Sequence, residues 1–379
     1  RDLVRSRGLG DVYKRQRFKI MKKVRMTLVI LITVFFCNKI YAQTEVLSAT
    51  LQQGDKTSVL YGPNAFIDAI KLVKDSIDVI NLSSGKFNAP TINKACIIYG
   101  AGFERDEERN LYPTIVDRVI IKPDLVSDDD GNMTNQKGAI DGLHIEGIYF
   151  SGCHFSSNDE SAIYEVHNIS FKRCYLGKLT FFYSGMNSCP FNSKVVNCVI
   201  GELVHFPNVV NFGVYNCIIE RATCAQDIYN KDVIIKNCII FSTYSYGCAY
   251  KDNIFISDYI DFDTAAETAS FCSHNIATKK DYFKNIDESR NNNNWDGKTS
   301  IGIFGEDIGN KYNSKYTYKL KEGNASIYIG SDGKEVGLYG GEYPFSKIPS
   351  NPQILSKEID VQTTTEGKLK VNVKIEAQP

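Results

Sequence analysis

Two groups of acidic residues offer the most evident chemistry in this sequence of 379 residues. The first is the run Asp128, Asp129 and Asp130 in "SDDDGN". Carboxylates are calcium ligands, but the order of the acids in this run does not follow the spacing of an EF-hand loop. A calcium site is therefore one explanation of the run, and a solvated loop is the simpler one.

The second group is "SDYIDFD", which contains Asp258, Asp261 and Asp263. In an extended strand Asp261 and Asp263 point to the same face, because side chains alternate with a period of two. Two carboxylates on one face could hold calcium or a ligand, or serve as acid and base in the hydrolysis of a glycosidic bond. A solvent-facing strand explains them equally well.

Cysteine is the third candidate, because "VVNCVI", "VYNCII" and "IIKNCII" repeat Asn-Cys followed by two aliphatic residues. Such a recurrence could be a metal site, a disulfide framework or a structural repeat. A zinc site needs Cys or His residues that converge from short spacings such as C-x2-C, and the sequence contains no such spacing.

Alignment on cysteine extends the pattern to five segments with steps of 21, 24, 19 and 21 residues between successive cysteines. Periods near 20 residues are typical of a solenoid, in which each repeat packs only against its neighbours. Stacked interior thiols are favoured over disulfides for this column, which consists of Cys153, Cys174, Cys198, Cys217 and Cys238. Other cysteines fall outside the column and either pair or stay free: Cys96, Cys189, Cys224, Cys248 and Cys272.

The residue before each aligned cysteine marks a bend between two strands. Apolar residues stand three positions before and two positions after every aligned cysteine, so the inward phase shifts by one residue between them. The residues at the shift are Gly152, Arg173, Asn197, Asn216 and Asn237. Gly and Asn tolerate a left-handed backbone, and Asn side chains stacked ~4.8 Å apart could bond to one another as an asparagine ladder. We predict that Asn turns the chain and that Cys begins the next strand.

Two further segments resemble secreted right-handed parallel β-helix proteins with the pectate-lyase-like fold, of the type found in Bacteroidetes. "NAFIDAIKLVKDSIDVINLSSGKFNAPTINKACIIYGAG" (64–102) is similar to the opening of such chains, and "KEVGLYGGEYPF" (334–345) to the segment with which they leave the solenoid. In the first segment Asn64 is the expected N-cap of a helix. Its apolar face would consist of Phe66, Ile67, Ile70 and Val73.

The predicted fold is therefore all-β: a right-handed parallel β-helix solenoid with an N-terminal capping helix and a short C-terminal β hairpin. Residues 1–20 are interpreted as a non-native leader, and residues 21–42 have the anatomy of a secretory signal peptide. Residues 43–76 would hold a leader and the capping helix, residues 77–345 the β-helix, and residues 346–379 a linker and the hairpin. Within the range of the β-helix, residues 287–314 are polar and rich in Asn, which predicts a long loop.

The predicted location is outside the cytoplasm, secreted or periplasmic, without a membrane span. Residues 1–42 carry 11 basic and 2 acidic residues, which leaves 33 basic and 42 acidic residues, a net charge of −9, in the rest of the chain. An acidic protein is a poor nucleic-acid binder.

Other candidate ligand-binding residues are His154, which should point outward next to the inward Cys153, and Tyr175 of the neighbouring coil. The chain contains 22 Tyr and 21 Phe, and outward rows of aromatic rings suit stacking on sugars. The tyrosines expected near coil edges are Tyr164, Tyr175, Tyr183, Tyr215, Tyr244, Tyr246 and Tyr250.

The resembling fold is shared by lyases, hydrolases and non-catalytic adhesins, so fold alone does not fix the function. Hydrolases of the polygalacturonase type carry Gly-His-Gly and Arg-Ile-Lys patterns, which this sequence lacks. Lys172 or Arg173 could supply the base of a lyase, but no complete catalytic constellation emerges. We therefore expect a non-catalytic, monomeric protein that binds carbohydrate or associates with a cell-envelope glycan, without a cofactor unless calcium binds. The alternative is a polysaccharide lyase or glycoside hydrolase.

Overall fold

The computed structural model describes residues 46–107, 111–124, 137–155, 163–181, 188–204, 210–223, 233–245, 248–256, 260–262, 270–359 and 366–376. The chain divides into two units, Arg1–Val46 and Leu47–Pro379, and the helices and strands of the described residues belong to the second. The predicted leader and signal peptide lie outside the described residues.

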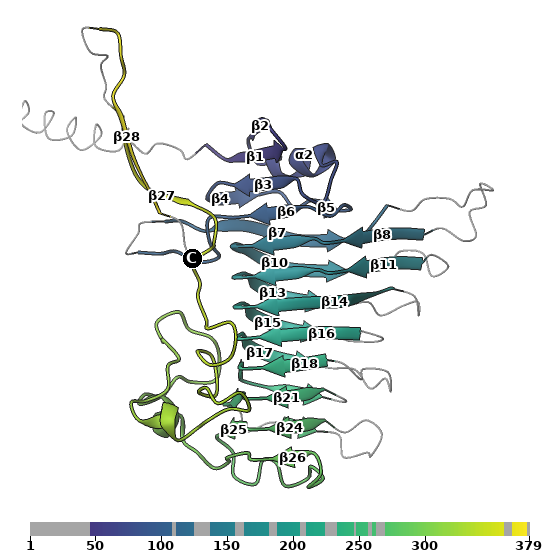
Figure 1. Ribbon diagram of the computed structural model, residues 1–379, viewed down its shortest axis with the longest axis vertical. Coiled ribbons are helices and arrows are strands. Elements are labelled where there is room, and N and C mark those ends of the chain that lie inside the picture. The colour runs from purple at the N-terminus through teal and green to yellow at the C-terminus, as the bar shows by residue number, and fades with distance from the viewer. Residues whose placement is uncertain are drawn as a thin grey trace, which may run out of the picture. The chain divides into compact units, whose positions relative to one another are not determined.

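Two long sheets run along the stack of coils (Figure 1). In the described residues the first sheet has 14 strands, and beyond the antiparallel strands β1 and β2 at its first edge its pairings are parallel. Its main path is β2 (Lys56–Tyr61), β1 (Ser48–Gln53), β3 (Val79–Leu82), β6 (Ile97–Tyr99), β9 (His144–Glu146), β12 (Ser170–Lys172), β14 (Ser188–Val196), β16 (Val210–Tyr215), β18 (Val233–Lys236), β21 (Ala249–Lys251), β24 (Phe271–Ser273) and β26 (Asn291–Asn292). β8 (Lys137–Asp141) and β11 (Ile163–His167) join beside β14.

The second sheet has 12 parallel strands in the same part of the chain. Its main path is β25 (Ile276–Ala277), β22 (Ile254–Phe255), β19 (Ile239–Ile240), β17 (Ile218–Thr223), β15 (Val199–Val204), β13 (Tyr175–Thr180), β10 (Ile148–Phe155), β7 (Thr114–Ile121) and β4 (Gly85–Phe87), joined by β5 (Thr91–Ile92), β20 (Thr243–Ser245) and β23 (Ile260–Phe262). Each coil contributes to both sheets, so the predicted parallel β-helix is confirmed.

The predicted bends lie between the two sheets. Arg173, Asn197, Asn216 and Asn237 have φ between 49° and 55°, the left-handed conformation that the sequence pattern required. The same bend continues through later coils at Asp252, His274 and Asn293, whose φ angles are 59°, 54° and 50°. The period therefore extends beyond the five segments aligned by cysteine.

Cys153 does not belong to the column in which it was placed. The register pairs Tyr149 with Tyr175 and Cys153 with Leu179, so Ile148, not Cys153, stands opposite Cys174. The bend of this coil is Gly147, with φ 74°, rather than Gly152. Cys153 points inward and is fully buried, but it lies five residues further along the eight-residue strand β10.

The remaining cysteines form the predicted stack of buried thiols. The backbone N–H of Cys174 donates to Sγ of Cys198 at 3.3 Å, Cys198 donates to Cys217 at 3.3 Å, and Cys217 donates to Cys238 at 3.4 Å. Burial raises the pKa of the thiols of Cys174, Cys198 and Cys217 well above its ordinary value. Cys96 and Cys272, which the sequence placed outside the column, are free and buried, and Cys248 is buried as well.

An asparagine ladder is present, but one position after the bend and in later coils. Asn253 accepts from the N–H of Cys238 at 2.8 Å, Asn275 accepts from the N–H of Asn253 at 2.9 Å, and Asn294 accepts from the N–H of Asn275 at 2.7 Å. The ladder thus continues the cysteine column. The prediction that the bend asparagines bond to one another is wrong, because their amide groups donate to backbone carbonyls within residues 337–344.

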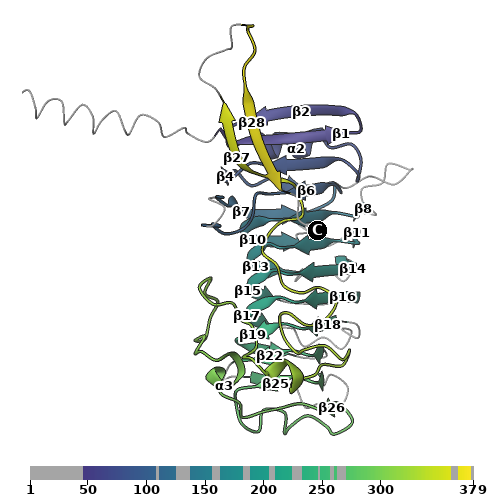
Figure 2. The same cartoon turned by 60° about the vertical axis from the view of Figure 1, so that its left-hand side comes forward.

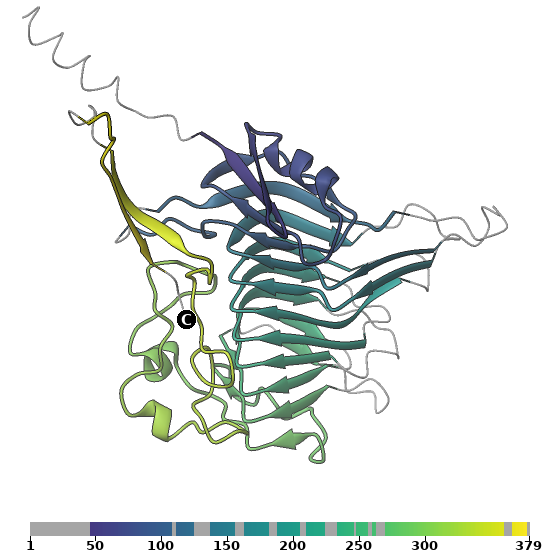
Figure 3. The same ribbon diagram turned by 45° about the horizontal axis from the view of Figure 1, so that its top comes forward.

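Both ends of the core are covered. The helix α2 (Ala65–Leu72) packs against β1. Of its predicted apolar face, Phe66, Ile70 and Val73 are buried and Ile67 is half-buried. The helix lies with the β1–β2 hairpin over the first coil (Figure 3). Asn64 occupies the N-cap position but makes no side-chain cap bond; its Oδ1 accepts from Asn88. At the opposite end Tyr282 and Phe283 pack against Phe255.

Residues 287–314, predicted as a loop, include β26 and the short helix α3 (Ser300–Phe304). A single turn of 3₁₀-helix, η2 (Asn324–Ser326), follows. The chain ends in β27 (Gln353–Ile359) and β28 (Val371–Glu376), an antiparallel pair that matches the predicted hairpin. No helix in the described residues is long and apolar enough to cross a membrane.

Candidate functional site

Most of the predicted acidic candidates lie outside the described residues: Asp128, Asp129, Asp130, Asp258 and Asp263. Asp261 lies in β23, where its backbone pairs with Tyr244 of β20. The hypotheses of a calcium site and of paired carboxylates therefore stay predictions. In the described part of the chain, no three His, Cys, Asp or Glu side chains are grouped as metal ligands.

His154 and Tyr175 do not lie together, contrary to the prediction. His154 pairs in register with Thr180, whereas the ring of Tyr175 stacks on Tyr149 with centroids 4.6 Å apart. The reason is the displacement of Cys153 along β10, which moves His154 by the same five residues.

The predicted outward row of tyrosines is not observed among the side chains that the structure describes. Tyr250 is fully buried in the core, and Tyr215 packs against Tyr343. Tyr244 is 36% exposed. The side chains of Tyr164, Tyr183 and Tyr246 lie outside the described residues.

Arg173 is not available as a catalytic base. Its guanidinium donates to the buried carboxylate of Glu146 at 2.6 Å. The other predicted base, Lys172, lies beside it, and burial and the charge of Arg173 lower the pKa of Lys172. Arg173 instead belongs to a polar cluster with Glu146 and Ser350.

Residues 331–350, here called the return segment, run back along the column of bends (Figure 2). At one end the N–H and the hydroxyl of Ser331 both donate to Asp252 at 2.7 Å. At the other end the N–H and the hydroxyl of Ser350 donate to Glu146 at 2.7 and 2.8 Å. A serine and a buried carboxylate thus fix each end in the same way.

The bend asparagines hold the return segment between these two ends. Asn237 donates to the carbonyl of Gly337 at 3.2 Å, Asn216 to the carbonyls of Leu338 and Gly340 at 2.9 and 2.8 Å, and Asn197 to that of Pro344 at 3.2 Å. A Cβ at Gly341 would lie 2.4 Å from the Asn237 Oδ1, so the close approach requires glycine in "YGGEYPF".

A cleft of about 730 Å³ lies between the return segment and two other stretches of chain. One wall is formed by residues from 101 to 107 and Leu111, and the other by residues 314–319 with the end of the return segment. Three stretches that are far apart in the sequence therefore meet at one place.

Glu104 joins these three stretches. Its carboxylate accepts from the Tyr312 hydroxyl at 2.6 Å and from Lys347 Nζ at 2.5 Å, and Lys347 also lies over the ring of Tyr312. Burial and the neighbouring Glu104 raise the pKa of Tyr312 far above its ordinary value. Tyr312 is therefore a neutral hydrogen-bond donor that keeps the walls of the cleft in place.

Aromatic rings line the cleft: Tyr316, Tyr318, Tyr339 and Phe345. Tyr318 is buried, and burial raises its pKa to about 12. The rings of Tyr316 and Tyr339 are half-buried, and the Tyr339 hydroxyl donates to the Thr317 carbonyl at 2.7 Å. Exposed charged side chains complete the lining: Arg105, Glu107, Lys315 and Lys319.

Only part of this cleft has a signal in the sequence. Alternating tyrosines in "KYTYKL" (315–320) indicate an exposed edge with one aromatic face, but nothing in the periodicity places them beside Glu104, more than 200 residues earlier. Neither a family model, nor a curated protein, nor a solved structure matches this chain.

Proposed function

We propose that this protein is a non-catalytic glycan-binding solenoid, secreted or periplasmic, whose ligand site is the cleft between Glu104 and the return segment. The observation that carries the proposal is the lining of the cleft: aromatic rings beside charged and hydrogen-bonding groups. Sugars have apolar faces that stack on aromatic rings and hydroxyl groups that need polar partners. The volume of about 730 Å³ falls within the range of about 300–1,000 Å³ of small-ligand sites.

The contacts of Glu104 favour binding over turnover. Both oxygens of Glu104 are engaged by Tyr312 and Lys347, so this carboxylate holds the walls and is not poised as an acid or a base. A catalytic carboxylate pair requires two groups that both reach the scissile bond. A polysaccharide lyase or hydrolase remains the alternative, and an assay for turnover of polysaccharides distinguishes the two functions.

The test is binding of the protein to a panel of neutral and acidic polysaccharides, with and without calcium. Tyr316→Ala and Tyr339→Ala should each weaken the binding of a positive glycan about tenfold, as expected when a stacking ring is lost. Tyr244→Ala, which removes an exposed ring outside the cleft, is the matched control and should bind normally.

Binding unchanged in both cleft variants would refute the location of the site. Turnover of any polysaccharide above background would refute the non-catalytic function and establish the enzymatic alternative.

A further inference from the structure

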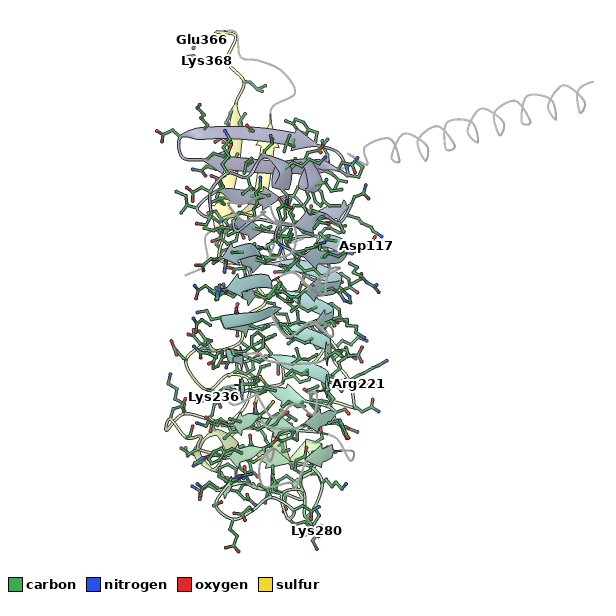
Figure 4. All side chains as sticks on the ribbon, turned by 90° about the vertical axis from the view of Figure 1, so that its right-hand side faces the viewer. Asp117, Arg221, Lys236, Lys280, Glu366 and Lys368 are labelled. Atoms are coloured by element: carbon green, nitrogen blue, oxygen red, sulfur yellow. The ribbon has the colours of Figure 1, made fainter. Side chains whose placement is uncertain are left out.

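A second polar site lies on the outer face of the 12-stranded sheet. Arg118 of β7 pairs in register with Gly152 of β10, and the pairing of Cys153 with Leu179 places Gly152 opposite Lys178 of β13. Neighbouring strands are ~4.8 Å apart, so two cations flank one glycine at a distance of roughly 10 Å between their strands. Figure 4 shows Asp117 and Arg221, which belong to this face, on the side of the ribbon opposite to Lys236.

The missing side chain of Gly152 leaves a notch that His154 enters. A Cβ on Gly152 would lie 3.0 Å from His154 Nε2 and 3.5 Å from Arg118 Cγ. The imidazole therefore lies over the glycine, between Arg118 and Lys178.

Two polar atoms on this face have no hydrogen-bond partner among the described residues. His154 Nε2 and Thr180 Oγ1 are both buried without a hydrogen bond to any described residue, and the two residues are neighbours in register. An unpaired buried polar atom costs about 1–3 kcal/mol. A ligand that entered the notch and bonded to these atoms would remove that cost.

The charges around the notch specify the sign of that ligand. Arg118 makes no ion pair with a described residue, Lys178 pairs with Glu202 at 3.0 Å, and Asp117 pairs with Lys86 at 3.1 Å. Burial, with Arg118 and Lys178, lowers the pKa of His154 below its ordinary value. The field at the imidazole is therefore positive before any ligand binds.

We propose that Arg118, His154, Lys178 and Thr180 bind an oxyanion, that is, the carboxylate, sulfate or phosphate group of an acidic ligand. The guanidinium offers two parallel donors to such a group, Lys178 contributes a second positive charge, and the imidazole N–H and the threonine hydroxyl complete the set of donors. This site is independent of the cleft and of the function proposed for it.

The binding is coupled to the protonation of His154. A bound anion stabilises the imidazolium and raises the pKa of His154. Affinity therefore increases as the pH falls, by about tenfold for each unit by which the anion raises that pKa.

The experiment follows the five histidines of the protein by NMR across the pH range in which imidazole titrates, alone and with sodium sulfate, inorganic phosphate or glucuronate. We expect a raised pKa of His154 with at least one probe, and the probes that raise it identify the chemical group. His274, whose Nε2 lies 3.1 Å from Nδ2 of Asn293, serves as the internal reference and should not change.

Variants separate this site from general attraction of anions. Arg118→Gln should weaken binding of the active probe at least about tenfold, and His154→Ala should abolish the pH dependence. Arg221→Gln removes a cation of the same face that lies 3.9 Å from Glu202, and it should bind normally. An unchanged pKa of His154 with all three probes, or equal binding by Arg118→Gln and the unmodified protein, would overturn the proposal.

Discussion

Replacement of Glu146 by Gln tests how the return segment is fixed to the solenoid. The Glu146 side chain is 1% exposed and accepts from Arg173 at 2.6 Å and from the N–H and hydroxyl of Ser350 at 2.7 and 2.8 Å. His144 Nε2 lies 3.3 Å from the same carboxylate. The substitution keeps the shape of the side chain but removes the charge opposite the buried Arg173.

The magnitude follows from the pKa of Glu146. Burial alone would raise this pKa, but the hydrogen bonds from His144, Arg173 and Ser350 outweigh burial and lower it from 4.5 to about 2. Each unit corresponds to about 1.4 kcal/mol, so the ionised carboxylate contributes ~3 kcal/mol to the free energy of unfolding. Because the folded-state pKa is lowered, this stability is present above pH 4.5 and is lost as the pH falls towards 2.

The assay is urea unfolding of the unmodified protein and of Glu146→Gln at a series of pH values. We expect the variant to be less stable by ~3 kcal/mol at neutral pH, and we expect the difference to shrink as the pH falls from about 4.5 towards 2. The control is Glu202→Gln, which removes a carboxylate from a half-exposed pair with Lys178 and should cost less than about 1 kcal/mol. A difference that does not depend on pH, or an equal loss in the control, would show that the ionised Glu146 does not provide this stability.

Three further predictions concern the bends and the column behind them. Asn216→Leu should lower the melting temperature more than Tyr215→Leu, because Asn216 has φ 49° and donates two hydrogen bonds to the return segment; equal melting temperatures would contradict the role of the bend. Cys217→Ala should cost about 1–3 kcal/mol in urea unfolding, because the buried N–H of Cys198 loses its acceptor and a small cavity is left, and the column thiols should react with a thiol reagent only after denaturation; rapid labelling of the folded protein would contradict their burial. Asn275→Leu should cost about 1–3 kcal/mol, because it removes the acceptor of the Asn253 N–H; a melting temperature equal to that of the unmodified protein would contradict the ladder.

The coils and their bends could be predicted because they are local. A left-handed residue followed by a small inward residue leaves a short signal that each coil repeats, and Asn197, Asn216 and Asn237 all fit it. The spacing assigns Cys153 wrongly to the cysteine column, because its distance of 21 residues from Cys174 matches the period. The bend of its coil is nevertheless at Gly147. Spacing alone therefore gives the period of a solenoid but not the phase within each coil.

The cleft could not be predicted for a different reason. Glu104 and Tyr312 are brought together by the path of the chain after its last coil, and no periodic pattern describes that path. The role of the bend amides was missed on the same ground: their geometry was predicted, but their partners are backbone carbonyls at the other end of the sequence. The outward position of His154 made it a candidate ligand-binding residue. Its neighbours Arg118 and Lys178 could not be predicted, because they depend on the register of the strands.

The return segment changes how the solenoid is expected to unfold. A solenoid without such a segment has only nearest-neighbour coupling, so its coils can fray one at a time from either end. Here one stretch of chain is bonded to successive coils from Asp252 to Glu146, which links coils that do not touch each other. We expect these coils to open together in a single transition, whereas the coils beyond Asp252 can separate earlier, so that cooperativity in this protein is set by the span of the return segment and not by the number of coils.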